Sequence, residues 1–222
     1  LQATKRLRGG VMVTGMVYRH PAVLANMAAT LDHTSGGRLE FGVGAAWNED
    51  ECNAYGIELG TMTERFDRFA EGLEVIKLML TQKQSSFNGK YFTLTDAYCE
   101  PKPIQQPMPP VLIGGGGMKR TLPLVAQYAD HWNFPGNSED PLGDLKKSVT
   151  RLKECCDEIG RDISTIRIST QLWVDRMSEA EAIERALAYE DAGVGLAIVS
   201  LPRPLNVKHI KEYPELFASV WK

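Results

Sequence analysis

The chain alternates short apolar runs with long amphipathic segments, and this alternation limits the folds open to it. The apolar runs occupy residues 9–14, 38–45, 111–114, 131–134, 166–174 and 196–201. They are nearly continuous in apolar character, which is typical of parallel strands covered on both faces. Strands that alternate with helices in this way indicate either an open doubly wound sheet or a closed barrel.

The segments between these runs carry helical patterns. We expect helices at residues 21–35, 62–81, 119–129, 142–160, 179–192 and 207–221, the last with a break near Pro214. Residues 1–8 are expected to form the end of another helix. In residues 21–35 the apolar positions recur at helical spacing, which predicts one buried face. Its members are Val23, Leu24, Met27, Ala28 and Leu31.

One segment interrupts the alternation. Asn88 and Gly89 form a hairpin turn signal between residues 86–87 and 91–94, so we expect an inserted hairpin over about residues 84–108. A closed eight-unit barrel takes about 250 residues, and this chain shows six strand–helix units in 222 residues. The expected fold is therefore an α/β (β/α)8 TIM-type barrel, as one domain over residues 1–222, that lacks its first two units.

Composition excludes several classes of protein. The net charge of −3 and the scattered basic residues give no nucleic-acid face. No apolar stretch approaches the roughly 20 residues that cross a bilayer. The four cysteines fit neither a zinc spacing nor a disulfide framework, and we expect free thiols in a reducing cytoplasm. They are Cys52, Cys99, Cys155 and Cys156.

A run of four glycines lies between a predicted strand and a predicted helix. It consists of Gly114, Gly115, Gly116 and Gly117. Backbone without Cβ atoms approaches an anion closely, and the first amides of the next helix point at the same place. The run matches neither the dinucleotide nor the Walker fingerprint. It predicts either a phosphate-binding loop or a tight turn that needs glycine.

Two further loops contain candidate residues. Asn48 follows the second predicted strand and offers a donor and an acceptor to a flavin-like ring, while Glu49 is either a general acid or a helix-opening acid. Thr14 ends the first strand, and His20 is either a base or a helix cap. The remaining histidines have no partner in the sequence that would make a metal site, and no nucleophile elbow indicates a hydrolase.

The motifs, taken in order, resemble those of the bacterial luciferase-like monooxygenase superfamily. They are VTGMVYRHPAVLANMAATLDHTSGGRLEFGVG at residues 13–44, GAAWNEDECNAYGI at 44–57, ERFDRFAEGLEVIKLMLT at 64–81, FNGKYFTL at 87–94, CEPKPIQQPMPPVLIGGGG at 99–117 and YADHWN at 128–133. Within the superfamily the chain resembles the branch that uses the deazaflavin coenzyme F420.

The resemblance implies an eight-stranded barrel and a cofactor site. A non-proline cis peptide that props the cofactor ring is expected at Val11–Met12. The residues that the resemblance places at the cofactor are Val11, Met12, Thr14, Gly44, Ala45, Asn48, Gly114, Gly115, Gly116 and Gly117. Some deazaflavin dehydrogenases carry a glutamate as proton donor just after the GVG of the family's fourth strand, whereas this chain has Ala45, Ala46 and Trp47 there and its first acid is Glu49.

The activity that the resemblance implies is hydride transfer between coenzyme F420 and a small organic substrate. The alternatives are a monooxygenase that uses reduced FMN and dioxygen, and a flavin-binding barrel without turnover. Glu49 and His20 are the candidates for a catalytic role, and no metal is expected. A homodimer or a higher oligomer is expected from the resemblance.

Overall fold

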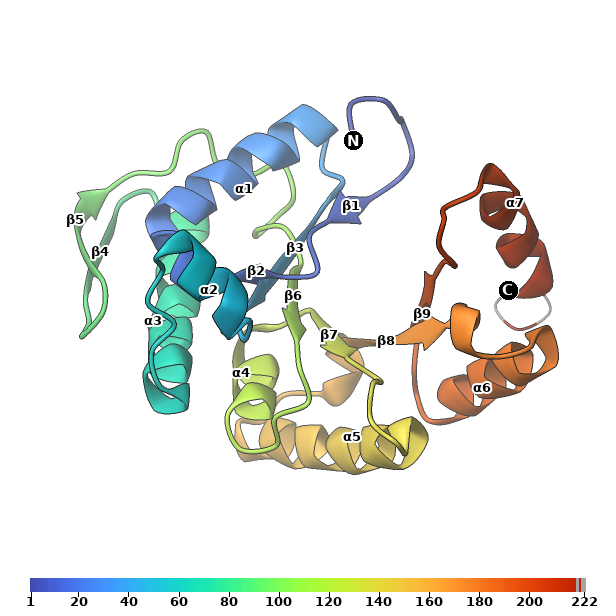
Figure 1. The fold of residues 1–222 in the computed structure, drawn as a ribbon. Coiled ribbons are helices and arrows are strands. Elements are labelled where there is room, and N and C mark those ends of the chain that lie inside the picture. Colours follow the sequence, from blue (N-terminus) through green and yellow to red (C-terminus); the bar gives the residue numbers. More distant parts are fainter. Residues whose placement is uncertain (219, 221–222) are drawn as a thin grey trace. The chain divides into compact units, whose positions relative to one another are not determined.

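The computed structural model describes residues 1–218 and 220. It divides into two compact units, which are described one at a time. The first unit comprises Leu1–Gly114 and Gln127–Asp130, and the second comprises Gly115–Ala126 and His131–Lys222. The α/β class is confirmed: each unit is built on parallel strands connected by helices (Figure 1).

The sheet of the first unit is centred on β3 (Leu39–Gly44). It pairs in parallel with β1 (Gly9–Gly10), β2 (Thr14–Gly15) and β6 (Val111–Gly114). The prediction of one strand over residues 9–14 is wrong at its centre, because residues 11–13 leave the ladder between β1 and β2. An apolar run in the sequence does not distinguish a paired residue from one in a bulge.

Two long helices cover this sheet. The helix α1 (Pro21–Ser35) and the helix α3 (Met62–Thr81) have the predicted bounds, and they pack against each other. A glycine in the left-handed conformation, Gly36 with φ of 67°, ends α1. At the start of α3, Thr61 and Glu64 form a capping box.

The buried face of α1 differs from the predicted one. Leu24 and Ala28 are buried as expected, but Val23, Met27 and Leu31 are 54%, 42% and 48% exposed. The helix carries two apolar stripes, and the stripe that packs inward consists mainly of alanines. Small side chains let a helix approach its neighbours closely, and hydropathy alone does not show which stripe does so.

Four other segments complete the first unit. Residues 1–8 form no helix, contrary to expectation; Arg38 holds them by donating to the carbonyls of Leu1 and Leu7. A short helix, α2 (Glu49–Tyr55), follows β3, and a 3-10 turn, Met16–Tyr18, follows β2. The predicted hairpin is confirmed as β4 (Ser85–Asn88) and β5 (Thr93–Ala97).

The second unit repeats the alternation. Its parallel strands are β7 (His131–Phe134), β8 (Arg167–Trp173) and β9 (Leu196–Ser200). Its helices are α4 (Thr121–Tyr128), whose last two residues belong to the first unit, α5 (Pro141–Glu158), α6 (Glu179–Asp191) and α7 (Val207–Leu216). Two 3-10 turns, Ile163–Thr165 and Val174–Arg176, flank β8. The predicted bounds agree to within two residues, apart from the C-terminal helix. The predicted break near Pro214 is wrong, because α7 continues through Pro214 and ends at Leu216; the predicted end at Trp221 lies outside the described residues.

The core of the second unit includes polar groups with hydrogen-bond partners. Trp132 is fully buried, and its Nε1 donates to the carbonyl of Gly115 at 2.8 Å. The Asn133 Nδ2 donates to the Ser169 Oγ at 2.9 Å. All four cysteines are buried free thiols. Within the described residues, no helix combines the length and the apolar character needed to span a membrane.

Candidate cofactor site

The predicted residues of the first unit gather at one edge of its sheet. Thr14 pairs with Val43, and Gly15 pairs with Gly44, so β2 and β3 end at the same level. On the other side, Val43 pairs with Ile113, one residue before Gly114. The carboxyl ends of parallel strands are where such folds place their ligand sites. The structure therefore brings Thr14, Gly44 and Gly114 to the edge that a cofactor would use.

The segment between β1 and β2 packs against glycines of this edge. A Cβ atom on Gly42 would lie 1.9 Å from the Val11 carbonyl oxygen, and one on Gly44 would lie 2.7 Å from the Val13 Cγ2. On Gly114 the nearest atom would be the Val13 Cγ1, at 3.4 Å. Only glycine at residues 42 and 44 allows this approach of backbone and side chain. Gly42 and Gly44 therefore let the segment of residues 11–13 pack directly on β3.

The cis peptide bond lies one residue later than expected, at Met12–Val13 rather than Val11–Met12. Val11 and Met12 are themselves exposed, by 66% and 42%. Neighbouring apolar residues carry no signal that separates one peptide bond from the next, so the sequence could not fix this position. The contact of Val11 and Met12 with a cofactor stays a prediction.

The loop after β3 contains the predicted Ala45 and Asn48. Asn48 caps α2: its Oδ1 accepts the Glu51 N–H at 3.1 Å. This bond occupies the amide oxygen and leaves the NH2 group for other partners. Ala46 has a φ of 70°, a conformation that non-glycine residues rarely adopt, and its carbonyl accepts from Arg65 at 3.3 Å.

The structure gives each of the two candidate catalytic residues a structural role. Glu49 is exposed in the first turn of α2, where the helix dipole favours an acid. His20 caps α1 through its Nδ1, which accepts the Ala22 N–H at 3.2 Å. The His20 ring also meets the Phe92 ring edge-on, with centroids 5.2 Å apart. The capping role of His20 and the helix-start position of Glu49 explain why these residues stand there, and a role in catalysis stays a prediction.

A tyrosine–glutamate pair at this edge was not anticipated. The Tyr18 hydroxyl donates to the Glu51 Oε2 at 2.5 Å. This bond, then burial and the Cys52 thiol, raise the pKa of Tyr18 above its usual value. A Cβ on Gly15 would lie 2.8 Å from the Tyr18 ring, so the ring packs on the end of β2. Residues 33 positions apart in different segments offer no spacing rule that would have joined them.

In the second unit the predicted loop is a turn of glycines. Gly115 has a φ of 123°, and its N–H donates to the Asn133 carbonyl at 3.0 Å. The Gly117 carbonyl accepts the N–H groups of Thr121 and Leu122, at 2.9 and 3.1 Å, and so begins α4. The turn explains why glycine is needed at residue 115.

The same loop has the features of an anion site. Gly116 and Gly117 donate no hydrogen bond to any residue that the structure describes, so their amides are available. Two exposed basic residues, Lys119 and Arg120, follow directly and were not singled out from the sequence. A phosphate group therefore fits the donors present in this loop. Across the described residues, no cluster of three or more His, Cys, Asp or Glu side chains is placed to hold a metal ion.

The chain was compared with known proteins. A family model described as luciferase-like monooxygenase matches residues 1–216. The uncharacterized protein Rv0953c of Mycobacterium tuberculosis is 36% identical over 159 residues, 72% of this chain and 54% of that protein. The pyrimidine monooxygenase RutA of Cronobacter turicensis is 31% identical over 147 residues, 65% of this chain and 38% of that protein.

The fold of the chain is also similar to that of solved structures. An F420-dependent secondary alcohol dehydrogenase in complex with an F420–acetone adduct matches with a TM-score of 0.86 and 21% identity, over 100% of this chain and 82% of that one. The predicted barrel class of the fold is thereby confirmed. The chain spans about half the length, or less, of the curated relatives that it matches. From the family match, the chain belongs to the luciferase-like monooxygenase family.

Proposed function

We propose that this chain forms part of an oxidoreductase that transfers a hydride between the deazaflavin coenzyme F420 and a small organic substrate. The observation that carries the proposal is the fold match with a TM-score of 0.86 to a dehydrogenase whose structure holds an F420–acetone adduct. That match covers 82% of the dehydrogenase, so it includes most of the fold that holds the adduct.

The residues of the chain supply binding and orientation in this proposal. In this proposal the ring lies against the segment of residues 11–13, which packs on Gly42 and Gly44 and keeps Val11 and Met12 exposed. The amides of Gly116 and Gly117, followed by Lys119, hold a phosphate group. A bound deazaflavin supplies the hydride chemistry, and the protein determines which face of the ring a substrate reaches.

In this proposal Tyr18 and Glu51 have only a supporting role in proton transfer. The Tyr18 phenol is protonated at neutral pH as an ordinary tyrosine is, and the hydrogen bond to Glu51 raises the pKa of Tyr18 further. Because the one O–H of the phenol already donates to Glu51, the Tyr18 oxygen is offered to a ligand only as a hydrogen-bond acceptor. Glu49 and His20 remain weaker candidates, since His20 caps α1 and Glu49 is exposed at the start of α2.

The second candidate function is a monooxygenase that uses reduced FMN. It is favoured by the 31% identity to a protein named pyrimidine monooxygenase. Both functions use the same fold and a phosphate-bearing cofactor, so the residues of the loops do not separate them.

Cofactor titration separates the two functions. We expect coenzyme F420 to quench protein fluorescence with micromolar affinity and FMN to bind at least tenfold more weakly. Tight binding of FMN without a response to F420 would move the assignment to the monooxygenase. Riboflavin serves as the matched control for FMN, because it lacks only the phosphate. Equal affinity for FMN and riboflavin would contradict the role of the glycine loop. If a cofactor binds but no substrate ever reoxidises it, the chain is a flavin-binding barrel without turnover.

A further inference from the structure

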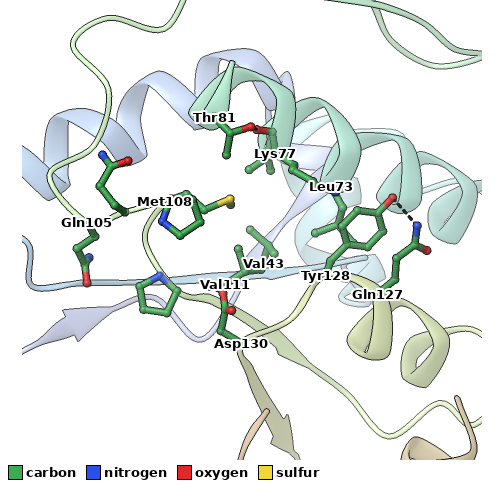
Figure 2. Close-up of a pocket in the computed structure, with 14 residues that line it drawn as sticks. Val43, Leu73, Lys77, Thr81, Gln105, Met108, Val111, Gln127, Tyr128 and Asp130 are labelled. Atoms are coloured by element: carbon green, nitrogen blue, oxygen red, sulfur yellow. Dashed lines mark hydrogen bonds between the residues drawn. The ribbon is translucent and has the colours of Figure 1, made fainter. Parts of the chain in front are cut away.

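A pocket of about 420 Å³ lies within the first unit (Figure 2). It is enclosed by the last turns of α3, residues 105–110, the start of β6 and residues 127–130. None of the residues predicted to contact the cofactor lines it. We propose that this pocket is a second binding site, for a small organic acid with an apolar body and one carboxylate.

The pocket and the predicted cofactor edge lie on opposite faces of β3. Successive side chains of a strand point to opposite faces. Gly42 and Gly44 face Val11 and Val13, whereas Val43 lines the pocket together with residues of α3. A ligand in the pocket therefore does not occupy the cofactor edge, and the site goes beyond the proposed function.

The floor of the pocket is apolar and buried. It is made by residues of β3, α3 and β6 whose side chains are no more than 3% exposed: Val43, Leu73, Ile76 and Val111. Met108 projects from the loop of residues 105–110 and forms part of the facing wall (Figure 2). Methionine adapts its shape to a partner. An apolar body therefore fits between this wall and the floor.

A cation marks one end of the pocket. Lys77 lines it from α3, and its Nζ lies 5.9 Å from the centroid of the Tyr128 ring. Over the described residues 1–218 and 220, Lys77 has no carboxylate within salt-bridge distance. Its three N–H donors are thus available to a carboxylate that enters along the apolar floor.

The carboxylates near the pocket lie across it from Lys77 or already accept a hydrogen bond. Asp130 lies across the pocket from Lys77 in Figure 2, and its Oδ2 accepts the Val111 N–H at 2.9 Å. Glu74, three residues before Lys77 on α3, accepts the hydroxyl hydrogen of Tyr128 at 3.0 Å, so this carboxylate already has a partner. Lys77 is the one cation among the described residues that line the pocket, and the ligand's carboxylate belongs at its end.

The test uses the purified protein, without cofactor, labelled with 13C in its methionine methyl groups. Sodium octanoate is titrated while the methyl signals are followed by NMR. We expect the Met108 signal to shift and to saturate. Met27 and Met62 are 42% and 59% exposed elsewhere and should not move. An unshifted Met108 overturns the proposal, and so do equal shifts at all three methionines, which would indicate adsorption to the surface.

Two variants and two matched probes test the role of charge. Lys77→Gln should weaken octanoate binding about three- to fivefold and should leave the binding of octanamide unchanged. Lys83→Gln is the control, since Lys83 is exposed just after α3 and does not line the pocket. Unchanged octanoate binding in Lys77→Gln overturns the proposal, as does tighter binding of octylamine than of octanoate. Because no cofactor is present, these outcomes are independent of the proposed function.

Discussion

Val13 packs against Gly44 so closely that a Cβ atom on Gly44 would lie 2.7 Å from the Val13 Cγ2. The contact joins the segment between β1 and β2 to the carboxyl end of β3, at the edge where a cofactor is expected. Gly114 also faces Val13, but a Cβ there would lie 3.4 Å away, an ordinary contact distance. The two glycines therefore differ in how much they tolerate a side chain.

This difference leads to the first expected outcome. Gly44→Ala should lower the free energy of unfolding by about 2 kcal/mol, because the extra methyl overpacks the edge, and should weaken cofactor binding. Gly114→Ala should change both by much less. Urea denaturation and cofactor titration measure the two effects. Adding Val13→Ala to Gly44→Ala should restore part of the loss, and equal effects of the two glycine variants would contradict the packing argument.

The bond between Tyr18 and Glu51 should contribute to stability. Tyr18→Phe removes one hydrogen bond to a carboxylate and should lower the free energy of unfolding by about 1 kcal/mol at pH 7. Tyr55→Phe is the control, since Tyr55 is 70% exposed. A Tyr18→Phe variant as stable as the control would show that the bond has no net effect.

Tyr128 should make the stability of the fold depend on pH. Burial, followed by the hydrogen bond to Glu74, raises the pKa of Tyr128 from 10.0 to about 12. A raised pKa means that the folded state favours the neutral phenol, so its stabilisation is complete below pH 10 and is lost as the pH rises toward 12. The free energy of unfolding should therefore fall more steeply above pH 10 in the wild type than in Tyr128→Phe. Parallel curves from pH 9 to 12 would refute this assignment.

The capping box of α3 provides a test of local structure. Thr61 accepts the Glu64 N–H, and the Glu64 carboxylate accepts the Thr61 N–H at 2.8 Å. Thr61→Ala should cost about 1 kcal/mol of stability in thermal or urea unfolding. Thr63→Ala, two residues along the same helix, is the matched control and should be neutral or slightly stabilising. A loss of similar size in both variants would mean that the box adds nothing.

The glycine loop of the second unit should be essential for the cofactor. Gly115→Asp places an anion where a phosphate is expected and adds a side chain at a φ of 123°. We expect at least about a hundredfold weaker binding of the cofactor, comparable to the loss of two charge-assisted hydrogen bonds. Gly160→Asp is the control: its φ is 70° and no atom lies within 4 Å of the added Cβ. Equal binding by the two variants would remove the phosphate site from this loop.

Two substitutions of His20 distinguish a role in helix capping from a role in catalysis. Asparagine caps helices as well as any residue, whereas alanine does not. His20→Asn should keep the stability of α1 and the turnover of the enzyme, and His20→Ala should lose about 1 kcal/mol of stability with turnover kept. If His20→Asn folds normally but loses turnover tenfold or more, His20 takes part in the reaction.

Much of the fold follows from the sequence because the relevant signals are local. The bounds of α1 and α3 are marked by Pro21, Gly36 and the Thr61–Glu64 box, each of which acts within one turn of its helix. The turn residues Asn88 and Gly89 likewise mark the hairpin. The strand β6 appears as a short apolar run between prolines and glycines.

Features that depend on distant contacts could not be predicted in this way. The inward stripe of α1 is set by how closely the helix approaches its neighbours, and the break between β1 and β2 is set by the fit of Val13 against Gly44. The bond of Tyr18 to Glu51 and the pocket at Lys77 join segments that only the folded chain brings together.

The sequence by itself determined the α/β class, the order of strands and helices, and the motifs that indicate the family, because each rests on the periodicity or identity of neighbouring residues. The tertiary structure decided which glycines a side chain crowds, which polar groups are already engaged, and where a second pocket lies. Those properties depend on distances of a few ångströms between residues far apart in the chain, which no local pattern encodes.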